Sequence, residues 1–123
     1  MNNIQPRETA LKVLYEINEK GAYSNIALNK FLKSSGHTEK DNAFITEIVY
    51  GTVKWKSAID LVIEKYSKIK LKKLSPYILN ILRMGVYQIL YMDKVPDSAA
   101  CNESVKLARK YGHEASSRYV NAV

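Results

Sequence analysis

Apolar residues recur at every third or fourth position through nearly the whole chain, and this spacing restricts the fold more than any other property. The clearest stretch follows Ser75 and Pro76, an N-cap hydroxyl and a proline suited to a first helical turn. Its apolar row comprises Ile78, Ile81, Leu82, Gly85, Val86, Ile89 and Leu90. No segment alternates with a period of two, and no Asn-Gly or Asp-Gly pair marks a hairpin. The sequence therefore predicts an all-α fold.

Glycine, proline and capping residues divide this pattern into six or seven helices. At 123 residues the chain has room for one domain, which can bury a core without disulfides or metals. A break is expected between Trp55 and Ser57, where the apolar stripe of the third helix is interrupted. The other predicted ends are Gly21, Gly36 and Gly112, and the predicted starts are Pro6, Thr38 with Asp41, Ser75 with Pro76, Asp97 as a cap, and Glu114.

Two glycines, Gly51 and Gly85, lie inside predicted helices rather than at their ends. Glycine in a helix interior costs about 1 kcal/mol relative to alanine. Neither residue belongs to a phosphate-binding glycine pattern. We therefore expect both glycines to mark places where two helices approach closely.

Positive charge is concentrated in one segment. The chain has 19 Lys and Arg against 12 Asp and Glu, a net charge of +7. Residues 54–73 hold seven lysines (54, 56, 65, 68, 70, 72 and 73) against Asp60 and Glu64, which leaves +5 in this segment. Such a cluster is typical of a polyanion-binding surface, and its alternative is a solvated, lysine-rich face without a ligand.

Several classes of function are disfavoured by composition. The single cysteine, Cys101, excludes an internal disulfide framework and fits a reducing compartment. Uncharged stretches such as residues 74–82 are far too short to span a membrane, and the first residues lack the apolar region of a secretion signal. We find no nucleophile–base pair, metal-ligand cluster or nucleotide loop. The chain is expected to be cytoplasmic, to bind no metal or cofactor itself, and to lack a catalytic site of its own.

Two arginines are candidates for direct contacts with a polyanion. Arg7 lies in the first turn of a predicted helix, where a cation opposes the helix dipole, so a partner could supply the anion. Arg83, Tyr87 and Tyr91 are spaced by four along one helix flank, and such side chains can pair with phosphates and stack on bases. In the alternative, the tyrosines are half-buried at a helix interface with Arg83 packed over them.

Three ordered segments resemble one known family. Residues 41–54 (DNAFITEIVYGTVK) are similar to its R-A-x-x-x-E-L-V-Y-G-T-L-R signature, and residues 82–91 (LRMGVYQILY) to its LR-x-G-x-YQ-L-L-Y helix. Val95–Pro96, residues 102–108 and residues 119–123 resemble its VP…NEAVELAK…FVNAVLR ending. The family is the NusB-like RNA-binding domain in the version found at the N-terminus of RsmB/Sun-type 16S rRNA cytosine-C5 methyltransferases.

This resemblance implies an orthogonal helical bundle over residues 1–123 that binds rRNA. It also implies a methyltransferase domain beyond the C-terminus, with S-adenosylmethionine bound only there. The apolar helical pattern that runs into Val123 fits a fragment of a longer protein. Lys54 stands where the family has arginine, which keeps the charge but loses bidentate geometry.

The resulting hypothesis is an RNA-binding module whose partners are rRNA and the methyltransferase domain of the same chain, with no membrane involved. Its predicted RNA-binding residues are Arg7, Lys54, Lys56, Lys70, Lys72, Lys73 and Arg83. Two alternatives stay open. One is a stand-alone NusB-type antitermination factor, which the single arginine near the N-terminus disfavours; the other is a helical protein-interaction domain.

Overall fold

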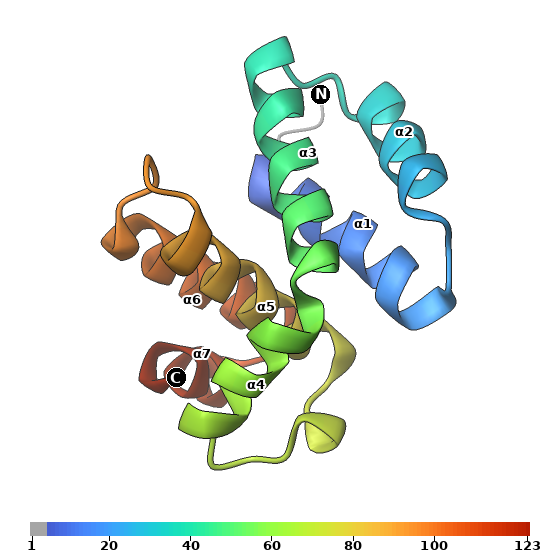
Figure 1. Cartoon of the computed structure of the whole chain (residues 1–123). Helices are drawn as coiled ribbons and strands as arrows, with labels where there is room; N and C mark the ends of the chain where they lie inside the picture. Colours follow the sequence, from blue (N-terminus) through green and yellow to red (C-terminus); the bar gives the residue numbers. More distant parts are fainter. Residues whose placement is uncertain (1–4) are drawn as a thin grey trace.

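The computed structural model describes residues 5–123, and this part of the chain forms seven α-helices, one 3₁₀ turn and no strand (Figure 1). The prediction of an all-α bundle of six or seven helices is therefore confirmed. The helices are α1 (Pro6–Lys20), α2 (Ser24–Ser35), α3 (Glu39–Lys54), α4 (Lys56–Tyr66), α5 (Pro76–Tyr91), α6 (Asp97–Tyr111) and α7 (Glu114–Ala122), and the 3₁₀ turn is η1 (Leu71–Lys73).

Most predicted helix ends are confirmed by their local geometry. The Ser75 hydroxyl accepts a hydrogen bond from the backbone N–H of Ile78, and Thr38 does the same for Asp41, both at 3.2 Å. Gly21 and Gly36 end α1 and α2 in the left-handed conformation, with φ of 72° and 71°. The prediction for Asp97 is wrong, because the preceding Pro96 occupies the N-cap and Asp97 is already the first helical residue.

Helix α5 is the centre of the bundle. It packs against α1, α3, α4, α6 and α7, so it is buried over most of its length. The predicted apolar row forms core from Ile78 to Gly85 but reaches solvent at its end, where Ile89 and Leu90 are 44% and 51% exposed. These two residues of the last turn therefore lie at the surface although they continue the predicted apolar row.

The two interior glycines lie at close helix contacts, as the sequence predicts. Gly51 of α3 packs against the side chain of Tyr87 on α5, and Gly85 of α5 packs against Ser104 of α6. A methyl group at either position would meet these side chains at less than van der Waals distance. Both glycines are thus explained by packing.

The predicted break between α3 and α4 is a sharp corner at one residue. Helix α3 ends at Lys54, α4 begins at Lys56, and Trp55 between them has φ −101° and ψ 16°. Figure 1 shows the chain changing direction where these two helices meet. No helix within residues 5–123 combines the length and apolar character that a membrane span requires. The corner places Trp55 and its two lysine neighbours at the surface, beside the end of α5.

Candidate nucleic-acid interface

The basic segment forms an exposed margin along α4 and the turn that follows it, which we call the lysine edge. Six of its members are exposed and Lys56 is half-buried. None of the seven forms an ion pair with a carboxylate of residues 5–123. The lysine edge comprises Lys54, Lys56, Lys65, Lys68, Lys70, Lys72 and Lys73. Its charge is therefore available to an anionic ligand.

Helix α4 separates the lysine edge into two groups. Lys54 and Lys56 flank the corner, whereas Lys68 to Lys73 lie in the segment between α4 and α5. With 11 residues, α4 is about 16 Å long, so the two groups lie at opposite ends of this helix. The predicted contacts are thus distributed along an edge rather than gathered into one pocket.

An open hollow lies beside the second group. It has a volume of about 670 Å³, and Lys68, Lys70 and Lys72 line it together with Asp60 and Glu64 of α4. Lys73 lines a different hollow of about 310 Å³, next to the start of α7. Lys70 and Lys72 therefore face one hollow and Lys73 faces another, so a ligand in either hollow contacts only one of these two sets.

Arg83, a predicted RNA contact, is almost fully buried, although it lines the open hollow that Lys68, Lys70 and Lys72 also line. It is 7% exposed, and its Nε and Nη2 donate to the two carboxylate oxygens of Asp60 at 2.8 and 3.0 Å. Its Nη1 donates to Asn80 Oδ1 at 3.3 Å. Because the guanidinium is buried and bidentately paired, Arg83 connects α5 to α4. Neither sequence interpretation of Arg83 anticipated this ion pair with Asp60.

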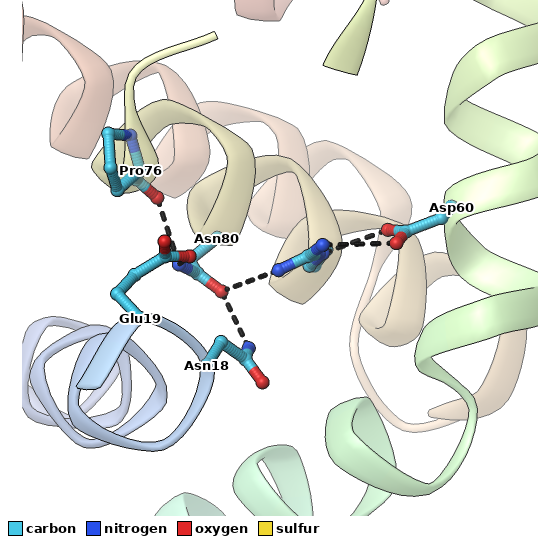
Figure 2. Close-up of polar contacts among 6 residues, drawn as sticks. Asn18, Glu19, Asp60, Pro76 and Asn80 are labelled. Atoms are coloured by element: carbon cyan, nitrogen blue, oxygen red, sulfur yellow. Dashed lines mark hydrogen bonds and ion pairs between the residues drawn. The ribbon is translucent and has the colours of Figure 1, made fainter. Parts of the chain in front are cut away.

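The Arg83 pair belongs to a larger polar network centred on Asn80, which is fully buried (Figure 2). Asn80 Oδ1 also accepts from Asn18 Nδ2 at 2.8 Å, and its Nδ2 donates to Pro76 O at 2.9 Å and Glu19 Oε2 at 3.2 Å. The network links α1, α4 and α5 through groups that are each satisfied. Its role is structural.

Arg7 is half-buried and has a structural contact of its own. Its Nε donates to Oε1 of the fully buried Gln88 at 2.7 Å, and its guanidinium lies 5.1 Å from the ring centroid of Phe44. Burial lowers the pKa of Arg7 below its usual value, and the negative charge of Glu103 offsets this lowering only in part. No hollow lined by the lysine edge includes Arg7.

Three aromatic side chains beside the corner form a stack: Tyr87 and Tyr91, which the sequence analysis considered beside Arg83, and Trp55, which it did not. Trp55 and Tyr91 have ring centroids 5.4 Å apart at an interplanar angle of 10°, and Tyr91 and Tyr87 are 5.4 Å apart at 22°. The Lys54 ammonium lies 5.4 Å from the Trp55 centroid. In the sequence, the only sign of this stack was a lone tryptophan between two lysines at a predicted helix break. That Trp55 stacks on Tyr91 follows only from the tertiary packing.

Comparison with known proteins identifies the relatives of this bundle. The sequence model of the NusB family matches residues 4–123. The chain is 34% identical to the probable ribosomal RNA small subunit methyltransferase B of Bacillus subtilis (strain 168), across 100% of this chain but only 27% of that protein. It is 38% identical to the transcription antitermination protein NusB of Clostridium novyi (strain NT), across 100% of this chain and 95% of that protein.

The fold agrees with solved structures. A crystal structure of the antitermination factors NusB and NusE in complex with dsRNA superposes with a TM-score of 0.86 at 23% identity, over 94% of this chain and 87% of that chain. The family match extends across all helices described above. The chain belongs to the NusB family.

Proposed function

We propose that this chain is an RNA-binding domain whose lysine edge neutralises RNA phosphates. The observation that carries the proposal is a row of seven lysines, none paired with a carboxylate of the described residues, on a NusB-family bundle. Lysine ammonium groups that contact phosphates release condensed counterions, and this release drives binding. A solved NusB with the same fold is in complex with dsRNA, which supports the same ligand class here.

The finer proposal is that residues 1–123 recognise rRNA for a 16S rRNA cytosine-C5 methyltransferase that uses S-adenosylmethionine. The B. subtilis relative supports it, because the whole of this chain matches little more than a quarter of that methyltransferase. The YGTVKW segment, residues 50–55, also resembles the methyltransferase version of the domain. On this proposal the cofactor and the catalytic residues belong to a separate domain, and this chain supplies RNA binding.

The second candidate is a stand-alone antitermination factor, supported by the 38% identity to C. novyi NusB over 95% of that protein. The two candidates differ in what the natural gene encodes after codon 123. A reading frame that continues into a methyltransferase domain supports the first, and a stop codon soon after this position supports the second. Sequencing the gene and measuring the mass of the natural protein decide between them.

A titration with labelled RNA at several salt concentrations tests the RNA-binding proposal. We expect the logarithm of the association constant to fall linearly with the logarithm of salt concentration. Replacing Lys54, Lys56, Lys70, Lys72 and Lys73 with glutamine should weaken binding and flatten this slope. Melting temperature should change little, because four of these lysines are exposed and none of the five forms an ion pair with a carboxylate of residues 5–123.

A matched control separates a local surface from total charge. Five exposed lysines elsewhere, Lys30, Lys33, Lys40, Lys94 and Lys106, are replaced with glutamine in a second variant with the same net charge. This control should keep most of the affinity and most of the salt slope. Equal losses in both variants would contradict the lysine edge as the RNA surface. An unmodified protein that binds no RNA at low salt would contradict RNA binding altogether and favour a protein-interaction domain.

A further inference from the structure

The aromatic stack at the corner runs from the core to the surface. Tyr87 is 7% exposed, Tyr91 is 40% exposed and Trp55 is 41% exposed. Because Tyr91 stacks on both of the others, Trp55 is the outer end of the three-ring stack. An exposed ring that ends a stack offers apolar, polarisable surface to a flat ligand.

The buried end of the stack is held rigidly. The Tyr87 ring lies against the backbone of α3 at Gly51, where no side chain intervenes. Tyr87 in turn supports Tyr91 one turn further along α5, and Tyr91 supports Trp55 at the corner. The exposed rings are therefore ordered before a ligand arrives, which reduces the entropic cost of binding.

The surroundings of Trp55 are basic. Lys54 and Lys56 flank it in the chain, and neither pairs with a carboxylate of residues 5–123. The Lys54 ammonium lies 5.4 Å from the Trp55 ring centroid. Aromatic rings combined with unpaired cations fit a ligand that carries both planar bases and phosphates. A protein partner for these rings would have to bring its own acidic groups.

We propose that Trp55, supported by Tyr91, is a stacking platform for an unpaired base of single-stranded RNA. This proposal rests on the proposed RNA-binding function and adds the position of one base and the strandedness of the ligand. A base that stacks on Trp55 displaces the Lys54 ammonium from the ring, and the flexible lysine stem lets it follow the phosphate. Bases inside a duplex are already stacked on both faces, so the platform discriminates against them.

Trp55 is the only tryptophan of the chain, so its fluorescence reports on the platform directly. Unmodified protein is titrated with a short oligouridine at low salt, and in parallel with a blunt RNA duplex of similar length. A fluorescent label on the RNA measures binding by anisotropy in the same samples. We expect the oligouridine to quench Trp55 emission as it binds, and the duplex to bind without comparable quenching.

Substitutions give a second readout. Trp55→Leu should weaken oligouridine binding on the order of tenfold, the usual effect of removing one stacking ring. Trp55→Phe should retain part of the affinity. The matched control is Tyr66→Leu, because Tyr66 is 61% exposed and has Lys65 5.5 Å from its centroid but does not stack on another described ring. It should bind like the unmodified protein.

The outcomes separate this proposal from the proposed function. RNA that binds by anisotropy without quenching Trp55, together with equal affinities of Trp55→Leu and Tyr66→Leu, overturns the platform and leaves RNA binding intact. Absence of any RNA binding overturns both. Emission that depends on protein concentration, with a dimeric mass in solution, assigns the rings to contact with a second copy and also overturns the platform. The quenching experiment uses only unmodified protein. Its result therefore tests the platform even if a variant fails to fold.

Discussion

The Tyr87 ring of α5 packs directly on the backbone of α3 at Gly51: a Cβ built on Gly51 would lie 2.0 Å from Tyr87 Cζ and 2.1 Å from its hydroxyl oxygen. Gly51 lies in the last turn of α3, where the backbone N–H of Trp55 donates to its carbonyl oxygen, so the helical backbone holds it in place. The packing brings α3 and α5 together and supports the aromatic stack.

Gly51→Ala is therefore expected to destabilise the protein despite the better helix propensity of alanine. Overpacking a close contact costs typically about 1–3 kcal/mol, which exceeds the propensity gain of about 1 kcal/mol. Urea unfolding measures the difference. In the control, Gly85→Ala, the new methyl group would meet mainly the Ser104 hydroxyl, at 2.8 Å, and this group can rotate away. Gly85→Ala should cost clearly less, and the reverse order would contradict this account of Gly51.

The Arg83–Asp60 pair should contribute to stability and leave RNA affinity unaffected. Asp60→Asn leaves a buried guanidinium without its countercharge, which we expect to lower the free energy of unfolding by about 3 kcal/mol, within the usual range for breaking a buried pair. Arg83→Lys loses the bidentate geometry and should also destabilise. RNA titrations at a temperature where the variants remain folded should give unchanged affinities. A loss of affinity in folded Arg83→Lys would contradict a purely structural role and assign Arg83 to the RNA surface.

Arg7 should stabilise the fold through Gln88, and its predicted contact with RNA can be tested separately from this role. Arg7→Met removes the donor to buried Gln88 Oε1, and an unsatisfied buried carbonyl costs about 1–3 kcal/mol. Combining it with Gln88→Met should recover part of this loss, which a double-mutant cycle by urea unfolding measures. If Arg7 also contacts RNA, Arg7→Met should weaken RNA binding equally in both backgrounds. Full affinity in the double variant would exclude Arg7 from the interface.

Glu8 should make stability depend on pH in the acidic range. Burial tends to raise its pKa, but hydrogen bonds from Lys110 at 2.9 Å and Tyr111 at 2.5 Å, with the charges of Lys110 and Lys12, outweigh burial and hold the pKa of Glu8 below its usual value. A lowered native pKa stabilises the fold above the unfolded pKa of about 4.3, and this stability is lost as pH falls through the native value.

Urea midpoints measured between neutral pH and about pH 3 test this dependence. Glu8→Gln should be less stable at neutral pH and should show a weaker decline on acidification than the unmodified protein. Glu114→Gln is the control, because that carboxylate is 59% exposed and pairs only with exposed Arg109. It should change the acid dependence little. Identical declines for the unmodified protein and Glu8→Gln would contradict the role of Glu8.

The sequence by itself determined the features that depend on neighbours in the chain. Helix ends at Gly21 and Ser75, the break at Trp55 and the close approaches at Gly51 and Gly85 all follow from backbone conformations and spacings that a few residues specify. The concentration of lysines between residues 54 and 73 is likewise a property of the chain, and their exposure follows from the cost of burying charge. The predicted N-cap Asp97 was wrong by one position, because Pro96 is the N-cap of α6.

Only the tertiary structure decided which distant groups meet. Asp60 and Arg83 are 23 residues apart, Glu8 and Tyr111 are 103 apart, and Trp55 of the α3–α4 corner meets Tyr91 of α5. Arginine and tyrosine spaced by four along a helix are found both in interior ion pairs and at RNA-binding surfaces. The periodicity of the sequence therefore could not decide which of these two environments Arg83 occupies. Packing of α4 against α5 placed a carboxylate beside that guanidinium, and the α3–α4 corner placed Trp55 on Tyr91, because burial selects partners by geometry in space rather than by distance along the chain.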